Sequence, residues 1–195
     1  MIPALLLFIS TVVYRVILGY HGGDNSWLPN FAPLAAIALC GPLIFQRRFL
    51  AFALPLAILI ASDILLNVHY GVAVISGEMV TRYVALGMIS LVGMGIRDHA
   101  RSGGILLAAA SGSMGFYLLT NTASWLAAPG YAKTLAGWVQ ALTLGLPGYP
   151  PTWMFLRNSL VSDLLFTTII LCCLALGRTH TTRKSALSTD VAARV

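Results

Sequence analysis

Residues 47–70 read RRFLAFALPLAILIASDILLNVHY. Two arginines precede an apolar run over 49–67, and roughly 20 such residues are needed for an α-helix to cross the hydrocarbon core of a bilayer. The single charged residue inside this run is Asp63. A carboxylate among apolar residues is costly in a membrane unless it meets a polar partner. This stretch therefore predicts a membrane helix that carries a buried functional or structural charge.

The rest of the chain repeats this pattern. Of its 195 residues, 58% are hydrophobic and only 9% are charged, whereas a soluble domain carries about 25% charged residues. Apolar runs of comparable length predict six membrane spans, at about 2–20, 29–46, 49–67, 79–96, 103–126 and 153–177. We therefore expect an all-α polytopic membrane protein, with one six-transmembrane-helix domain over 1–178 and a disordered basic tail over 179–195.

Basic residues alternate between the connections. Eight of the twelve lysines and arginines fall in two connections and the tail, namely Arg47, Arg48, Arg97, Arg101, Arg178, Arg183, Lys184 and Arg194. The connections at 21–28, 68–78 and 127–152 contain only Lys133. The positive-inside rule then places both termini in the cytoplasm and these three loops outside. Because the formal charge of +6 lies in short clusters, it does not predict a nucleic-acid partner.

The third outer loop, over 127–152, is long enough to contain its own element. Leu135, Trp138, Val139 and Leu142 repeat at helical spacing, which predicts an amphipathic helix within 131–145. Such a helix would lie on the membrane surface or cover the mouth of a site. Within the spans, Gly104, Ala108 and Gly112 recur every four residues, which predicts a face for close helix packing.

Polar side chains gather toward the predicted outer side. Six of them lie in the outer half of their spans, namely Arg15, Asp63, Arg82, Asn121, Arg157 and Asp163. Ser113, Tyr117, Asn121 and Trp125 form one stripe at four-residue spacing, and Ser159, Asp163 and Thr167 form another. All four tryptophans and all seven tyrosines lie in the same half or in the outer loops. We expect these stripes to face one another around a polar, aromatic chamber.

Two interpretations of the charges stay open. The three arginines Arg15, Arg82 and Arg157 exceed the two aspartates Asp63 and Asp163, and the surplus positive charge would suit an anionic group of a substrate. Alternatively, these groups pair with one another and only lock the bundle together. Neither the histidines nor the cysteines show metal-ligand spacing, so we expect no bound metal and no cofactor.

Four segments carry a resemblance to a known family. They are NFAPLAAIALCG (30–41), FYLLTNTASWL (116–126), YAKTLAGW (131–138) and RNSLVSDLLFT (157–167). In this order they resemble a bacterial family of membrane proteins that is similar to the substrate-binding S components of energy-coupling-factor (ECF) vitamin transporters. The resemblance covers about 10–175. It implies a six-helix bundle in the bacterial inner membrane, whose outer loops bind a vitamin or related micronutrient.

The resemblance also implies partners. Such proteins are energised by a shared module of one transmembrane subunit and two ATPases, often docked on an Ala-xxx-Ala face of the first helix. Here Ala4 is followed by Phe8, which leaves solitary action open. Solitary cobalamin transporters are similar in using a first-loop histidine and an acidic residue near the end of the third helix, which would be His21 and Asp63. Cobalamin is therefore one candidate ligand.

We expect substrate uptake rather than catalysis. The residues predicted to bind the substrate are Asn121, Trp125, Arg157, Asp163, Asp63, Arg82, Tyr117, Asn158, His21 and Lys133. The alternatives are a membrane-integral enzyme that modifies a bound nutrient, and a structural or assembly subunit without a ligand. H-E-x-x-H, G-x-S-x-G and P-loop patterns do not occur in the sequence, which disfavours the enzyme.

Overall fold

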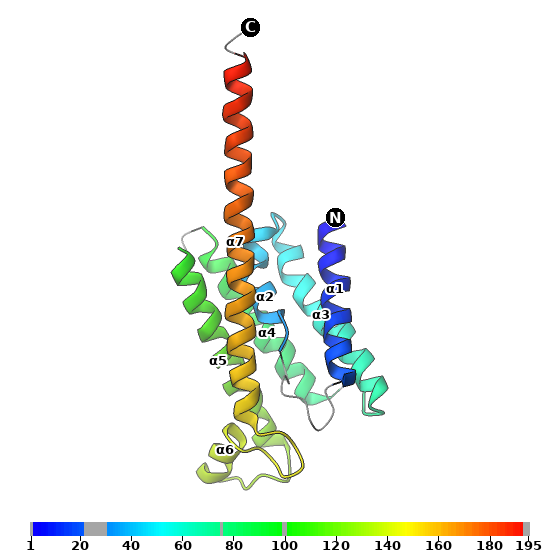
Figure 1. The fold of residues 1–195 in the computed structure, drawn as a ribbon. Coiled ribbons are helices and arrows are strands. Elements are labelled where there is room, and N and C mark those ends of the chain that lie inside the picture. The colour runs from blue at the N-terminus through cyan, green and yellow to red at the C-terminus, as the bar shows by residue number, and fades with distance from the viewer. Residues whose placement is uncertain (1, 22–30, 75, 99–100, 193–195) are drawn as a thin grey trace.

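The computed structural model describes residues 2–21, 31–74, 76–98 and 101–192. Within these ranges, the side chains of 2–5, 21 and 178–192 are not described. Within these ranges the chain is all-helical, with seven helices and no strands (Figure 1). The helices are α1 (Ile2–His21), α2 (Leu34–Ile44), α3 (Arg48–His69), α4 (Gly77–Ile96), α5 (Ser102–Ala127), α6 (Leu135–Leu142) and α7 (Thr152–Ala192).

Four helices are long and apolar enough to cross a membrane. They are α3, α4, α5 and the Thr152–Gly177 part of α7. Leu6–Tyr20 of α1 and Leu34–Ile44 of α2 are shorter apolar helices. The structure thus confirms the predicted helical membrane protein, and it shows four full-length candidate spans where the sequence predicts six.

The predicted second span is the element that differs most. The sequence predicts a span over 29–46, whereas α2 has only 11 residues, about 16 Å of helix. Pro33 disfavours the helical conformation at the residue before it, and Pro42 supplies no backbone N–H in the last turn. A continuous helix across the bilayer is therefore not formed there.

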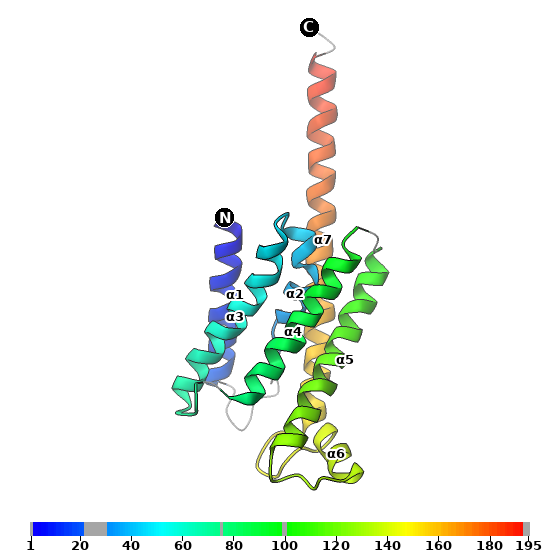
Figure 2. The same ribbon diagram turned by 180° about the vertical axis from the view of Figure 1, so that it is seen from behind.

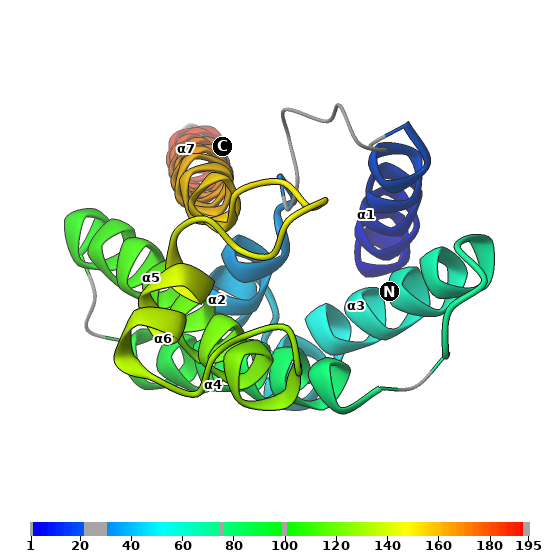
Figure 3. The same cartoon turned by 90° about the horizontal axis from the view of Figure 1, so that it is seen from below.

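This short helix occupies the centre of the bundle. It contacts α3, α4, α5 and α7, while α1 packs on α3 at the edge (Figure 3). Eight of the 11 residues of α2 are buried, and Ile37 and Leu39 join Ile58 and Leu86 in the apolar core. Burial of this kind places the start of α2 inside the protein rather than at its surface.

The helices alternate in direction. The start of α1, the α2–α3 connection and the far end of α7 lie at one end, while α6 and the α3–α4 connection lie at the other (Figures 1 and 2). We refer to the latter as the α6 end. Among the described residues, the basic α2–α3 connection and the far end of α7 therefore lie at the end opposite α6, as the charge pattern predicts.

The loop helix α6 and the end of α7 are the remaining elements. The amphipathic helix predicted within 131–145 is present but shorter, and Thr134 begins it by accepting a hydrogen bond from the Gly137 N–H at 3.2 Å. The tail predicted to be disordered from residue 179 instead continues α7 as a helix to Ala192 (Figure 1). Residues 178–192 contain neither proline nor glycine, so no residue there breaks the helix.

Candidate functional site

Two adjoining cavities lie between the helices. The larger, which we call the vestibule, has a volume of about 500 Å³ and lies at the α6 end. Its walls come from α4, α5, the start of α7 and the loop segments 128–131 and 145–150. The polar and aromatic residues that line it are Glu78, Arg82, Phe116, Tyr117, Thr120, Asn121, Ser124, Tyr131, Tyr149, Thr152, Phe155 and Ser159.

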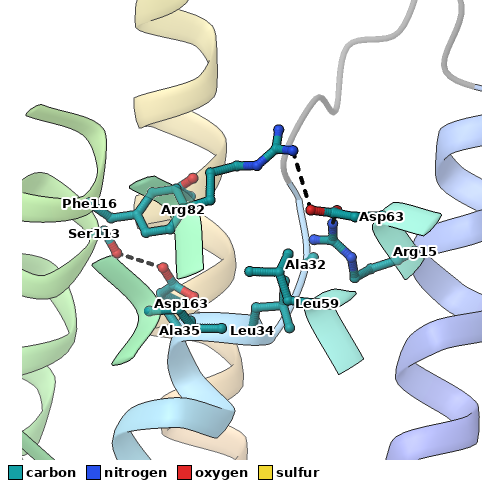
Figure 4. A pocket seen from close by; sticks show the side chains of 12 residues that line it. Arg15, Ala32, Leu34, Ala35, Leu59, Asp63, Arg82, Ser113, Phe116 and Asp163 are labelled. Atoms are coloured by element: carbon teal, nitrogen blue, oxygen red, sulfur yellow. Dashed lines mark hydrogen bonds and ion pairs between the residues drawn. The ribbon is translucent and has the colours of Figure 1, made fainter. Parts of the chain in front are cut away.

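The smaller cavity, which we call the inner cavity, has a volume of about 70 Å³ (Figure 4). This is room for a few water molecules. Its charged and polar lining residues are Arg15, Asp63, Arg82, Ser113, Ser159 and Asp163. Arg82, Phe116 and Ser159 line both cavities, so these three residues form the neck between them.

Asp63 of α3 is the centre of a charge cluster. Its Oδ1 lies 3.0 Å from Nη2 of Arg15 on α1, and its Oδ2 lies 3.3 Å from Nη2 of Arg82 on α4. The Nε of Arg15 also donates to the Ser62 hydroxyl at 2.8 Å. Pairing of this kind makes buried charges tolerable in an apolar surrounding. Two guanidinium groups against one carboxylate leave the cluster with one net positive charge.

Asp163 of α7 has partners of a different kind. Its Oδ2 accepts a hydrogen bond from the Ser113 hydroxyl of α5 at 2.6 Å, and its Oδ1 accepts one from the Ala36 backbone N–H at 3.3 Å. Ala36 is in the first turn of α2, where backbone N–H groups lack partners within the helix. The carboxylate therefore caps a helix start that lies inside the bundle, where the helix dipole also favours negative charge.

Hydroxyl groups and the amide of Asn121 supply most of the polar part of the vestibule wall. The Tyr117 hydroxyl donates to the Leu142 carbonyl at the end of α6, and the Asn121 amide donates to the Tyr117 carbonyl at 2.9 Å. Burial raises the pKa of Tyr131, with smaller contributions from Glu78 and Tyr117. The tyrosine therefore stays a neutral hydroxyl, able to donate and accept hydrogen bonds at a ligand.

The structure brings together five of the ten predicted site residues. Asp63, Arg82, Asp163, Tyr117 and Asn121 all line one or both cavities. They come from four helices that are far apart in the sequence. The predicted polar stripes on α5 and α7 thus do face each other, since Ser113 and Asp163 are hydrogen-bonded.

Two of the other predicted residues shape the loop after α5. The Trp125 indole donates to the Ala132 carbonyl at 2.8 Å. The Lys133 ammonium group donates to the carbonyls of Trp125 and Ala128, the latter at 2.8 Å. Lys133 therefore satisfies carbonyl groups at the end of α5, Trp125 satisfies one in the loop that follows, and neither side chain lines the vestibule or the inner cavity.

The remaining three also lie away from the cavity walls or outside the described side chains. The Arg157 guanidinium lies 5.3 Å from the centre of the Trp153 ring, and its Nε donates to Oδ1 of Asn158 at 3.0 Å. Neither Arg157 nor Asn158 lines the two cavities. The side chain of His21 lies outside the described residues.

Several lining residues were absent from the predicted set. Ser113 and Ser159 belong to the two polar stripes that the sequence predicts. Each lies one helical turn before a predicted site residue, so helical spacing indicates that both face the same interior. Glu78, Tyr131 and Tyr149 lie in or beside loops, where helical spacing carries no information. Among the described residues, no group of three or more His, Cys, Asp or Glu could hold a metal ion.

Four apolar helices of membrane-spanning length, with charged groups buried between them, define an α-helical membrane protein. Residues 1–186 match the model of a family described as a family of unknown function (DUF6580), and the chain belongs to that family. No curated protein and no solved structure matches the chain.

Proposed function

We propose that this protein is a substrate-binding membrane transporter of the S-component type, which takes up a vitamin or related micronutrient across the bacterial inner membrane. The observation that carries the proposal is the vestibule, a ligand-sized aromatic cavity that continues through a polar neck into a charged inner cavity. A bundle held together only by ion pairs has no need of such a chamber.

The size and chemistry of the vestibule support this proposal. Sites for small molecules typically measure about 300–1,000 Å³, and they combine apolar or aromatic walls with a few polar groups. The vestibule, at about 500 Å³, lies within this range. Its tyrosines and phenylalanines offer flat apolar surface, while Asn121, Thr120 and Arg82 supply directional hydrogen bonds.

We propose six membrane helices in this bundle. This count adds to the four long candidate spans α1, which runs between the two ends of the bundle, and the short central α2, which begins inside the bundle and leads to the α2–α3 connection. The basic connections then lie in the cytoplasm with both termini. The vestibule opens on the outer side, where a nutrient arrives.

The volume of the vestibule restricts the size of the ligand. Cobalamin remains a candidate, but a corrinoid with its nucleotide loop is much larger than the drug-sized molecules that a cavity of this volume suits. In addition, Asp63 is already engaged by two arginines. A smaller, flatter micronutrient is therefore the preferred substrate.

The source of energy for uptake also belongs to the proposal. An ECF-type module, with its transmembrane subunit and ATPases, would dock on the membrane-facing side of the bundle. A solitary mode is the alternative. Affinity purification of the tagged chain from its own membranes, followed by identification of associated ATPases, distinguishes the two.

The test begins with the ligand itself. The protein is purified in detergent, and native mass spectrometry measures the mass of any small molecule that it retains. Uptake of that molecule is then followed in cells that produce either the wild type or Asn121→Leu. Leu118→Ala is the matched control, because Leu118 is exposed on the same helix and does not line the vestibule.

The expected result is that Asn121→Leu loses binding and uptake while its unfolding temperature stays unchanged, and that Leu118→Ala behaves as the wild type. A protein that retains no small molecule and supports no uptake contradicts the proposal and favours a ligand-free structural subunit. A retained molecule that is covalently changed during incubation favours the membrane-integral enzyme.

A further inference from the structure

We propose that the substrate is a planar aromatic acid, and that its carboxylate binds the guanidinium group of Arg82 at the neck. This inference rests on the proposed function, because it names the chemical class of the molecule bound at the same site. The inference rests on a difference between the two arginines that pair with Asp63: Arg15 is buried and hydrogen-bonded, whereas Arg82 is more exposed and has an N–H group without a partner among the described residues.

Arg15 is buried and already bonded to groups of the protein. Its side chain is only 14% exposed, its Nη2 meets Asp63 at 3.0 Å, and its Nε donates to Ser62 at 2.8 Å. Arg82 is more open, with a side chain 37% exposed and a longer contact of 3.3 Å to Asp63. Within the described part of the chain, the buried Nε of Arg82 has no hydrogen-bond partner.

A buried N–H group without an acceptor is costly, and an acceptor on a ligand would remove that cost. The guanidinium group suits a carboxylate, since its N–H groups form a planar fork that matches two oxygens. If Arg82 turned toward such a ligand, Asp63 would keep its ion pair with Arg15. The cluster can therefore release Arg82 without leaving a buried carboxylate unpaired.

The surrounding charges favour one negative charge on the ligand rather than two. The Asp63 cluster carries one net positive charge, which a monoanion balances. The guanidinium end of Arg82 lies at Asp63 (Figure 4) and, in the described part of the chain, makes no ion pair with Asp163. Asp163 instead accepts hydrogen bonds from Ser113 and Ala36. A dianionic phosphate would exceed the positive charge available at the neck.

The walls of the vestibule indicate the body of the ligand. Phe116 lies beside Arg82 at the neck (Figure 4), while Tyr117, Tyr131 and Tyr149 line the space toward α6. Flat rings pack well against such side chains in offset or edge-on arrangements. An acid group at Arg82 and a flat ring between the aromatic side chains together define an aromatic carboxylate.

Glu78 provides an internal check on this inference. It lines the vestibule one helical turn before Arg82 on α4, and it is exposed. Residues at this spacing are neighbours on a helix surface, so its carboxylate repels an approaching acid. Removal of this charge by Glu78→Gln should strengthen the binding of an acid and leave a neutral analogue unaffected.

The experiment uses two probes of the same shape. Purified full-length protein in lipid nanodiscs is titrated with 2-naphthoate and with its neutral amide, 2-naphthamide, by equilibrium dialysis. We expect the wild type to bind the acid about tenfold more tightly than the amide, as suits a charge-assisted hydrogen bond. Arg82→Gln should remove this preference, and Glu78→Gln should increase it a few-fold.

The unfolding temperature of each variant is measured alongside. If Arg82→Gln does not fold, Arg82→Lys replaces it, because a lysine keeps the charge but lacks the planar fork and should show a reduced preference. Equal binding of the two probes by the wild type, including no binding of either, overturns the inference. A preference that persists undiminished in the Arg82 variant overturns it as well.

The outcome can be separated from that of the proposed function. A copurifying micronutrient without an acid group would overturn this inference and leave the transporter intact. A clear preference for the acid in a protein that supports no uptake would retain the Arg82 site and remove the transport role.

Discussion

Two aspartates line the inner cavity, and their partners differ in charge. Asp63 meets two guanidinium groups, whereas Asp163 meets a hydroxyl and a backbone N–H. In an apolar surrounding the first arrangement compensates the negative charge of Asp63, while the second satisfies hydrogen bonds at the start of a helix. The consequences of removing each carboxylate should therefore differ as well.

Substitution of Asp63 by asparagine should strongly destabilise the protein. It leaves Arg15, whose side chain is 14% exposed, as a buried charge without its carboxylate. Removal of one partner of a buried ion pair costs about 3–5 kcal/mol. Thermal unfolding in detergent measures the change.

Asp98→Asn is the matched control for this substitution. Asp98 pairs with Arg97 at 3.9 Å, and its side chain is 74% exposed. Exposed ion pairs contribute roughly 0–1 kcal/mol, so this variant should unfold almost as the wild type does. Equal losses in the two variants would contradict the structural role given to Asp63.

Substitution of Asp163 by alanine should also destabilise the protein, by about 1.5–3 kcal/mol, the usual range for hydrogen bonds to a charged group. Both the Ser113 hydroxyl and the Ala36 N–H would lose their acceptor. Ser113→Ala removes only one of the two bonds and should cost less. An Asp163→Ala variant with unchanged chemical denaturation would show that the start of α2 does not depend on this carboxylate.

At the scale of elements, the central α2 depends on a close approach to α4. A Cβ atom at Gly93 would lie 2.3 Å from the Leu39 carbonyl oxygen, which is far inside a normal contact. Because that oxygen belongs to the backbone, it cannot move aside cheaply. Glycine at this position allows the two helices to touch through their backbones.

Gly93→Ala should therefore destabilise the bundle by about 1–3 kcal/mol, as overpacking does. Gly95→Ala is the control on the same helix, since a Cβ there meets nothing within 4 Å. The control should be neutral or stabilising by up to about 1 kcal/mol, because alanine favours the helix. The two variants are compared by thermal unfolding, and a Gly93→Ala variant as stable as Gly95→Ala would refute the close approach.

At the scale of the whole molecule, the arrangement of the connections predicts a sidedness that can be labelled. Leu144 is exposed at the α6 end, and Gln46 is exposed in the α2–α3 connection at the other end. In a background with the three native cysteines replaced by alanine, Leu144→Cys should react with an impermeant maleimide in intact cells. Gln46→Cys should react only after the membrane is opened.

The opposite pattern of labelling would place the vestibule in the cytoplasm. The proposed uptake of an external nutrient would then fail, although the cavity itself would remain. Labelling of both positions from outside would mean that the two ends of the bundle in Figure 1 do not lie on opposite sides of the membrane.

A substantial part of the fold and of the candidate site could be predicted from the sequence. Apolar length predicted the helices, and the alternation of basic residues predicted which connections lie together. Helical spacing predicted that Tyr117, Asn121 and Asp163 face a common interior. It also suggested Trp125 as a ligand-binding residue, and Lys133 was predicted as another in the loop that follows. In the structure the Trp125 indole donates to a carbonyl of that loop, and the Lys133 ammonium group donates to carbonyls at the end of α5. Spacing shows which face a residue occupies, but not whether a nearby backbone group has already engaged it.

The class of protein followed from the sequence by itself, because apolar length and charge distribution act along the chain and need no knowledge of neighbours. Only the tertiary structure decided that α2 is a short central helix capped by Asp163, and that Arg82 is shared between Asp63 and two cavities. The first feature joins groups more than a hundred residues apart, Ala36 and Asp163, and the second joins side chains of different helices. Their contacts are set by packing in three dimensions, where distance along the chain carries no information.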